Sequence, residues 1–172
     1  FTAVFTTQDQ PRGGVIIKAT DESWNFAYNI SCPFTVKENM FVSSTYGTVG
    51  SFVTVCGTGY EATRTVNIWF GNVANYIGTQ TNPEGSFYTV FTVNTQVYGL
   101  KTVRARSVIS AEVDRGFVII PEIIVQPNTG SVGTTVTLHG TGYGVTEVVI
   151  INFGLTLTIH TVTANEIGTF TT

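Results

Sequence analysis

The stretch that decides the fold is GSVGTTVTLHGTGY, residues 130–143, and the chain carries a second version of it, GTVGSFVTVCGTGY, at residues 47–60. Each version opens with a Gly-x-Val-Gly turn, continues with apolar residues at every second position and closes on Gly-Thr-Gly-Tyr. Alternation with period two places apolar side chains on one face of a strand, and the glycine clusters mark the turns that bound it. The pattern therefore predicts the same strand, between the same turns, at two places in the chain.

The repeat extends in both directions from this stretch. Its offset is about 83–86 residues, the size of one small β-domain. Short alternating strands separated by Gly, Asn and Pro turns at this spacing predict an antiparallel β-sandwich. Three further pairs of segments line up: Val4-Phe5-Thr6 with Val90-Phe91-Thr92, Phe34-Thr35-Val36 with Phe117-Val118-Ile119, and Gly85-Ser86-Phe87 with Gly168-Thr169-Phe170.

The composition of the 172 residues agrees with strands: 42% are hydrophobic, 11% are charged, and the formal net charge is −3. Thr, Val and Ile make up about two-fifths of the chain, and these residue types favour pleated, half-buried strands over helices. Few basic residues argue against a nucleic-acid partner. The longest apolar stretches, residues 117–125 and 145–153, have the length of a strand, so no membrane span is expected in this segment.

These residues resemble the tandem immunoglobulin-like repeats of prokaryotic cell-surface proteins, the IPT/TIG-like type. The stretch at 130–143 and the Gly-Thr-Phe strand that follows it carry the resemblance, which covers nearly the whole chain. It implies an all-β fold of tandem immunoglobulin-like antiparallel β-sandwiches and an extracellular, cell-surface location. Repeats of this type occur in S-layers, adhesins and fibres, and as spacers in enzymes.

The register of the repeat predicts one complete module, residues 37–120, flanked by two complementary partial modules. Residues 1–36 correspond to the last three strands of a preceding module, and residues 121–172 to the first strands of a following one. Partial sandwiches expose strand edges and an apolar face, so other strands must cover them. Two interpretations stay open: a window on a long tandem array, or a head-to-tail fibre in which the strands of one subunit complete the next.

Two cysteines and one sequon stand out. Cys32 and Cys56 fall opposite Arg115 and His139 in the repeat, so both change together at the next junction, and the sequence predicts a disulfide between them that stiffens the hinge. Asn29-Ile30-Ser31 is an N-glycosylation acceptor pattern on an outward strand position, which makes Asn29 a candidate glycan site.

Three aromatic residues are candidates for an interface between molecules. Trp69 and Phe52 fall on outward positions of their strands, and Trp24 lies in the turn between two predicted strands. A calcium ion at a module junction is a further expectation, with Asp21, Glu22 and Asp114 as the acidic residues available for it.

Little in the sequence points to catalysis, and neither an enzyme nor another cofactor is expected. The two histidines, His139 and His160, lack metal-ligand spacing and fit outward strand positions. We expect a structural extracellular protein that self-associates into a homopolymer or lattice: a surface layer, sheath or filament. An adhesin or carbohydrate-binding surface module with glycan partners is the alternative, and a passive spacer in a secreted hydrolase is a third.

Overall fold

The computed structural model describes residues 2–19, 30–72, 76–108 and 111–172, and in these residues the chain forms only strands, turns and loops. The predicted all-β class is confirmed for this part of the chain. No helix long and apolar enough to cross a membrane is found among the described residues. The strands in chain order are β1 (Gly13–Ala19), β2 (Ile30–Val36), β3 (Asn39–Val42), β4 (Tyr46–Gly47), β5 (Phe52–Thr58), β6 (Thr65–Phe70), β7 (Tyr76–Gln80), β8 (Phe87–Thr92), β9 (Gly99–Ser107), β10 (Val113–Ile119), β11 (Glu122–Gln126), β12 (Thr137–Thr141), β13 (Val148–Phe153), β14 (Thr156–Thr163) and β15 (Phe170–Thr171).

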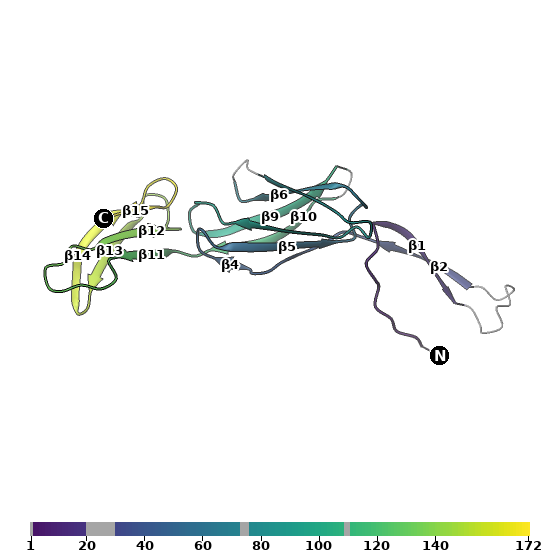
Figure 1. Cartoon of the computed structure of the whole chain (residues 1–172), viewed down its shortest axis with the longest axis horizontal. Coiled ribbons are helices and arrows are strands. Elements are labelled where there is room, and N and C mark those ends of the chain that lie inside the picture. Colours follow the sequence, from purple (N-terminus) through teal and green to yellow (C-terminus); the bar gives the residue numbers. More distant parts are fainter. Residues whose placement is uncertain (1, 20–29, 73–75, 109–110) are drawn as a thin grey trace.

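Strands β3 to β10 form two sheets around one core, and we call them the central unit (Figure 1). One sheet has the order β3-β5-β8 and is antiparallel. The other has the order β4-β10-β9-β6-β7 and is mixed, because β10 pairs in parallel with β4 and antiparallel with β9. Both sheets contribute buried side chains to the same cluster, so they face each other across it.

Alternation along β5 and β6 creates this core. Val53 and Val55 are buried while the residues between them are not, and the same holds for Val66 and Ile68 on the facing sheet. Phe70 joins the two sheets, because its ring lies 5.0 Å from that of Phe91 on β8 and 5.5 Å from that of Phe117 on β10, centroid to centroid. Aromatic pairs at such separations add to the stabilisation from burial alone.

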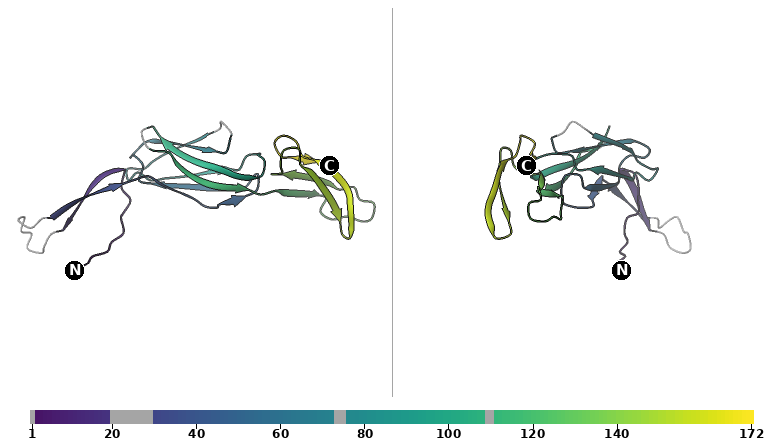
Figure 2. Two further views of the ribbon diagram at one scale, coloured as in Figure 1. Left: turned by 180° about the vertical axis from the view of Figure 1, so that it is seen from behind. Right: turned by 60° about the vertical axis from the view of Figure 1, so that its left-hand side comes forward.

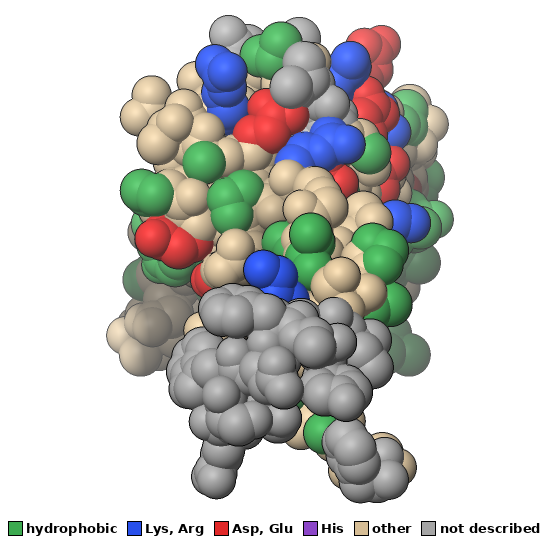
Figure 3. All heavy atoms as spheres, turned by 90° about the vertical axis from the view of Figure 1, so that its right-hand side faces the viewer, with side chains coloured by type: hydrophobic (Ala, Val, Ile, Leu, Met, Phe, Trp, Pro, Cys, Tyr) green, Lys and Arg blue, Asp and Glu red, His purple; other side chains and the backbone are tan. Residues whose placement is uncertain are grey.

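Smaller elements extend from the two ends of the central unit. The N-terminal hairpin, β1 and β2, projects from one end, and strands β11 to β15, which we call the C-terminal unit, project from the other (Figures 1 and 2). The C-terminal unit contains a three-stranded sheet, β11-β12-β15, and a separate pair, β13-β14. Seen from the hairpin end, basic and acidic side chains are interspersed with apolar ones rather than gathered by sign (Figure 3).

The internal repeat is visible in the backbone. A left-handed φ occurs at counterpart positions of the central and C-terminal units, including the non-glycine pair Thr63 and Thr146, both at 53°. Gly57 on β5 leaves room for the ring of Phe87, and Gly140 on β12 does the same for Phe170. The turns that bound the strands are therefore the same turns in both units, as the repeated stretches at residues 47–60 and 130–143 predict.

Two features of the fold differ from the sequence prediction. Residues 2–12 form no strand, although they align with β8. A strand needs a sheet to pair with: β8 pairs with β5, and the counterpart of β5 is β12, at the other end of the molecule. The short strand β4 was not predicted, because a segment of two residues carries no period.

Candidate functional site

The hairpin meets the central unit at a junction built on Arg12 and Tyr60. The backbone N–H of Arg12 donates to the carbonyl oxygen of Tyr60 at 3.1 Å. A guanidinium nitrogen of Arg12 lies 2.9 Å from a carboxylate oxygen of Glu38 and 3.9 Å from one of Glu61. The Glu38 side chain is only 8% exposed, and a carboxylate so little hydrated is stabilised by an adjacent cation. This first junction thus combines a backbone hydrogen bond with a shielded ion pair.

The central unit meets the C-terminal unit at a second junction with the same backbone contact. Here the N–H of Tyr98 donates to the carbonyl oxygen of Tyr143 at 3.4 Å, and these two residues are the repeat counterparts of the pair just described. Gly144 stands where the first junction has Glu61, and the Tyr98 ring lies over it. An aromatic ring packed on a glycine thus replaces the ion pair.

A glycine holds each junction close. Gly85 and Gly168 both have φ of 74°, a left-handed conformation that L side chains rarely adopt. A Cβ at Gly85 would collide with the carbonyl oxygen of Tyr60, and one at Gly168 with that of Tyr143. The two junctions therefore share one backbone geometry although their side chains differ.

The junction tyrosines are anchored by their rings. Tyr60 packs edge-on against Phe87 and Tyr143 against Phe170, with centroids 5.1 Å apart in both pairs. Burial raises the pKa of each hydroxyl above its ordinary value, because the charged phenolate loses hydration. Tyr60 and Phe87 belong to the central core, so this core positions the loop of the first junction. At the second junction the loop is held by the contact of Tyr143 with the buried Phe170.

The C-terminal unit exposes apolar side chains whose counterparts in the central unit are buried. Phe153 is 74% exposed, whereas its counterpart Phe70 is 7% exposed. Ile123 is exposed as well, whereas its counterpart Met40 lies in the core. In the central unit, β9 and β10 complete the enclosure of these positions, and the described part of the C-terminal unit contains no strand in their place.

The hairpin has the strands that the C-terminal unit lacks, but no sheet faces them in the described chain. Its strands align with β9 and β10, and Phe34 on β2 is the counterpart of Phe117. Phe117 is fully buried, whereas Phe34 is 39% exposed beside its cross-strand neighbour Val15. The hairpin therefore carries an apolar face without a second sheet beneath it in the described chain.

A row of apolar and aromatic side chains lies on the outer face of the β3-β5-β8 sheet. Phe41, Cys56 and Tyr88 stand directly opposite one another on the three strands, and Phe41 and Tyr88 are well exposed. Phe52, predicted to point outward, is 78% exposed on the same face. Sequence reasoning missed Phe41 and Tyr88, although each alternates with a core residue in the manner that identified Phe52.

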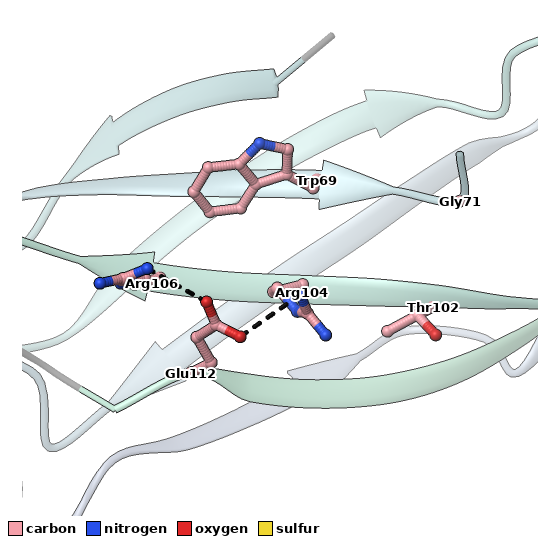
Figure 4. Close-up of a pocket in the computed structure, with 6 residues that line it drawn as sticks. All are labelled: Trp69, Gly71, Thr102, Arg104, Arg106 and Glu112. Atoms are coloured by element: carbon pink, nitrogen blue, oxygen red, sulfur yellow. Dashed lines mark hydrogen bonds and ion pairs between the residues drawn. The ribbon is translucent and has the colours of Figure 1, made fainter. Parts of the chain in front are cut away.

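Trp69 lies on the outer face of the other sheet, as predicted, and is half-buried. It borders a shallow depression of about 350 Å³ and stands opposite Arg104 on the neighbouring strand (Figure 4). Glu112 lies between two guanidinium groups there, 3.3 Å from a nitrogen of Arg104 and 3.2 Å from one of Arg106. The depression thus places an indole beside fixed charged groups.

Asp114, one of the acidic residues considered for calcium, is engaged by arginine. Its two carboxylate oxygens accept hydrogen bonds from Nε and Nη2 of Arg104 at 2.8 and 2.9 Å. This pair holds the pKa of the Asp114 carboxyl below its usual range. No group of three or more His, Cys, Asp or Glu side chains suited to a metal ion occurs among the described residues.

The predicted disulfide is wrong in this structure, because Cys32 and Cys56 are both free thiols. Val36, not Cys32, is the hairpin residue that reaches the central unit, where it lies against Gly59. Cys32 lies four residues before Val36, on β2 in the projecting hairpin, and Cys56 lies three residues before Gly59, on β5 within the central unit (Figure 1). At about 3.3 Å per residue, the two sulfurs lie roughly 20 Å apart, far beyond bonding distance.

We expect two reactive thiols in protein purified without reductant. Cys32 is exposed and Cys56 is half-buried, so a thiol reagent should modify Cys32 first and Cys56 more slowly. Intact-mass measurement after alkylation, with the Cys32→Ser variant as control, identifies each step. Protein that resists alkylation until it is reduced would contradict the free-thiol assignment.

Four predicted site residues lie outside the described residues: Trp24, Asn29, Asp21 and Glu22. The two histidines are where the sequence predicted them, exposed on strands β12 and β14. His139 shares a hydrogen bond of 2.9 Å with the hydroxyl of Thr171, across the β12-β15 pair.

No protein-family model matches this chain, and no curated protein does so either. The two junctions, the open faces and the outer-face side chains are the features of the structure that bear on function.

Proposed function

We propose that this chain is a structural extracellular segment of tandem immunoglobulin-like β-sandwich modules that self-associates into a cell-surface layer, sheath or filament. Residues 37–120 are the complete module, residues 1–36 the final strands of a preceding one, and residues 121–172 the first strands of a following one. The extracellular location is part of this proposal and rests on the resemblance to IPT/TIG-like surface repeats.

The observation that carries the proposal is the recurrence of one junction. The Arg12–Tyr60 and Tyr98–Tyr143 hydrogen bonds, each backed by a left-handed glycine, join successive units through the same backbone contact. Repeating one contact relates each unit to the next by one rotation and one translation, which builds an extended array.

The connection between units suits a mechanical role. The chain enters the central unit at β3 and leaves it at β10, and the β2-to-β3 and β10-to-β11 links are only two residues each. Short links leave little slack, so tension passes directly into strand hydrogen bonds and the buried core. The shielded Arg12–Glu38 pair and the Tyr98–Gly144 contact resist bending at the junctions.

The outer-face aromatic residues are the proposed lateral contacts. Exposed aromatic side chains on one sheet face are typical of surfaces that bind other proteins. Phe41, Phe52 and Tyr88 provide such a face on the β3-β5-β8 sheet.

Electron microscopy of negatively stained protein tests the proposal. The purified chain should form ordered filaments or sheets, and the double variant Phe41→Ser with Tyr88→Ser should lose lateral order while it unfolds within about 0.5 kcal/mol of the parent. Leu100→Ser, which removes another exposed apolar side chain from a different sheet, is the matched control. A protein that remains a monomer at every concentration would contradict the proposal.

The Trp69 depression favours carbohydrate binding as a second candidate function. An indole beside Arg104, Arg106 and Glu112 offers a stacking surface for a sugar ring together with hydrogen-bonding groups for its hydroxyls. Soluble monomer that binds glycans, and loses this binding in Trp69→Ala, would support this candidate over assembly.

A further inference from the structure

We propose that the N-terminal hairpin of one copy docks on the C-terminal unit of a second copy and takes there the position that β9 and β10 hold in the central unit. This inference rests on the proposed function and specifies its partner and its contact surface. The segment that covers the open C-terminal sheets is therefore β1 and β2 of another copy of this chain.

The repeat identifies both halves of the contact. Strands β1 and β2 are the counterparts of β9 and β10, and β11, β12, β13 and β14 are the counterparts of β3, β5, β6 and β7. In the central unit these two sets of strands pack together around the core. The chain thus carries a second version of each set, exposed at opposite ends of the molecule (Figure 1).

Strand edges are available where the docking requires them. In the central unit β9 lies between β10 and β6. In the described chain the counterpart β1 pairs only with β2, and the counterpart β13 pairs only with β14. Joining β1 to β13 would extend both two-stranded sheets into one sheet and remove two open edges.

The exposed aromatic residues match a contact that the structure already contains. Phe117 of β10 packs against Phe70 of β6 with centroids 5.5 Å apart. Their counterparts are Phe34 on the hairpin and Phe153 on the C-terminal unit, and both are exposed. Docking brings Phe34 of one copy onto Phe153 of the other and buries both rings.

The strandless segment of residues 2–12 gains a partner in the same arrangement. Phe91 of β8 stands opposite Val53 of β5 and packs against Phe70. The counterpart of Phe91 is Phe5, which is 64% exposed, and the counterpart of Val53 is Val136, which is also exposed. Because β15 already pairs with His139 and Gly140 of β12, Phe5 beside Val136 of the second copy would continue the position of β15 past Thr172. This placement explains why the segment forms no strand in a single chain.

A hairpin that docks on the C-terminal unit comes from a second copy, because the hairpin and the C-terminal unit of one chain cannot meet. The hairpin and the C-terminal unit lie at opposite ends of the central unit, which separates them along the length of its strands (Figures 1 and 2). The first junction also fits this arrangement. The completed unit contains the hairpin of one copy and the C-terminal unit of another, and it joins the central unit of the first copy through Arg12 and Tyr60. That contact is the counterpart of the Tyr98–Tyr143 contact inside each chain. Every junction along the resulting fibre then has the same backbone geometry.

The register of the docked strands follows from the central unit. Trp69 of β6 stands opposite Arg104 of β9, and the counterparts of these residues are Asn152 and Lys18. Both counterparts are exposed, and both lie on the outward side, so neither is needed in the buried contact. Lys18 of one copy is therefore expected directly opposite Asn152 of the next.

Cysteine cross-linking between copies tests this register. In a Cys32→Ser, Cys56→Ala background of the full chain, Lys18→Cys protein is mixed with Asn152→Cys protein and treated with copper–phenanthroline as the thiol oxidant. Directly opposed strand positions have Cβ atoms about 4.5–5.5 Å apart, close enough for a disulfide. We expect the mixed disulfide as the main product, seen as a covalent dimer by non-reducing electrophoresis and mass spectrometry.

Ile150→Cys is the matched control. It is exposed on the same face of β13 but two residues out of register, about 7–8 Å from the expected partner, so its yield with Lys18→Cys should be several-fold lower. A second variant, Phe153→Ser in the Asn152→Cys chain, removes an exposed ring without touching the central core and should reduce the cross-link several-fold.

The outcomes separate this inference from the proposed function. Equal cross-linking at positions 150 and 152, or none at either position in protein that still forms ordered filaments, overturns the hairpin docking and leaves assembly standing. Absence of both the cross-link and any assembly overturns both. Native protein in which later residues of the same polypeptide cover β11 to β14 overturns the second copy as occupant.

Discussion

Replacing Phe117 by alanine is expected to lower the free energy of unfolding of the central unit by about 3–5 kcal/mol. The ring is fully buried and packs edge-on against Phe70, at an interplanar angle of 82°. Truncation removes the burial of the ring, this aromatic contact, and the filling of a space that the rigid sheets on either side cannot close. Chemical denaturation followed by tryptophan fluorescence measures the change.

The repeat provides the control for this experiment. Phe34→Ala makes the same substitution at the counterpart position, where the ring is 39% exposed in the single chain. It should change the unfolding of the central unit by less than about 0.5 kcal/mol, since it touches no core side chain. If the two variants are equally destabilised, the core does not have the composition described here. If Phe34→Ala also weakens association between copies, the hairpin docking gains independent support.

The strands of the central unit were predictable because one face of each is buried. Val53 and Val55 on β5, and Val66 and Ile68 on β6, alternate with polar or exposed residues, and a shift of one residue would expose the whole set. The turns were predictable for a different reason. Left-handed positions such as Gly50 and Gly133 recur at the same place in each unit, and glycine adopts that conformation without strain.

Features that depend on the distance between elements were not predictable in the same way. The repeat aligned Cys32 and Cys56 with a pair of residues that change together, but it does not specify how far along β2 the chain reaches the central unit. Similarly, the alternation at residues 2–12 indicates a strand, yet a strand forms only where a sheet edge lies beside it. Alternation in a segment shows that it can pair as a strand. Whether it does depends on whether the fold places another strand edge beside it.

The junction contacts were predictable in part from the sequence. Aligning the repeats places Arg12 with Tyr98 and Glu61 with Gly144, so a basic–acidic pair in one junction becomes an aromatic–glycine pair in the other. That paired change indicates contact between the two positions, although the glycines in these segments by themselves indicate only turns. The structure brings both pairs together.

Replacing Gly85 by alanine is the second change for which we expect a large effect, a loss of about 2–4 kcal/mol. Two costs add: a left-handed φ of 74° in a residue with a Cβ, and a collision of that Cβ with the carbonyl oxygen of Tyr60. The carbonyl cannot move away freely, because the N–H of Tyr60 donates to the carbonyl oxygen of Gly85 itself at 2.9 Å. Relief of the collision requires the loop to leave Tyr60, and with it the hydrogen bond from Arg12.

Gly50→Ala separates the two costs. Gly50 has φ of 89° and no atom within 4 Å of the position a Cβ would take, so alanine there brings backbone strain alone, about 1–2 kcal/mol. The difference between the two variants, measured by denaturant unfolding of the full chain, is the energetic effect of the close approach at the junction. Equal losses would mean that the junction tolerates a side chain at Gly85. In that case the glycine would serve only its own turn, and the geometry shared by the two junctions would not depend on the tight contact that both contain.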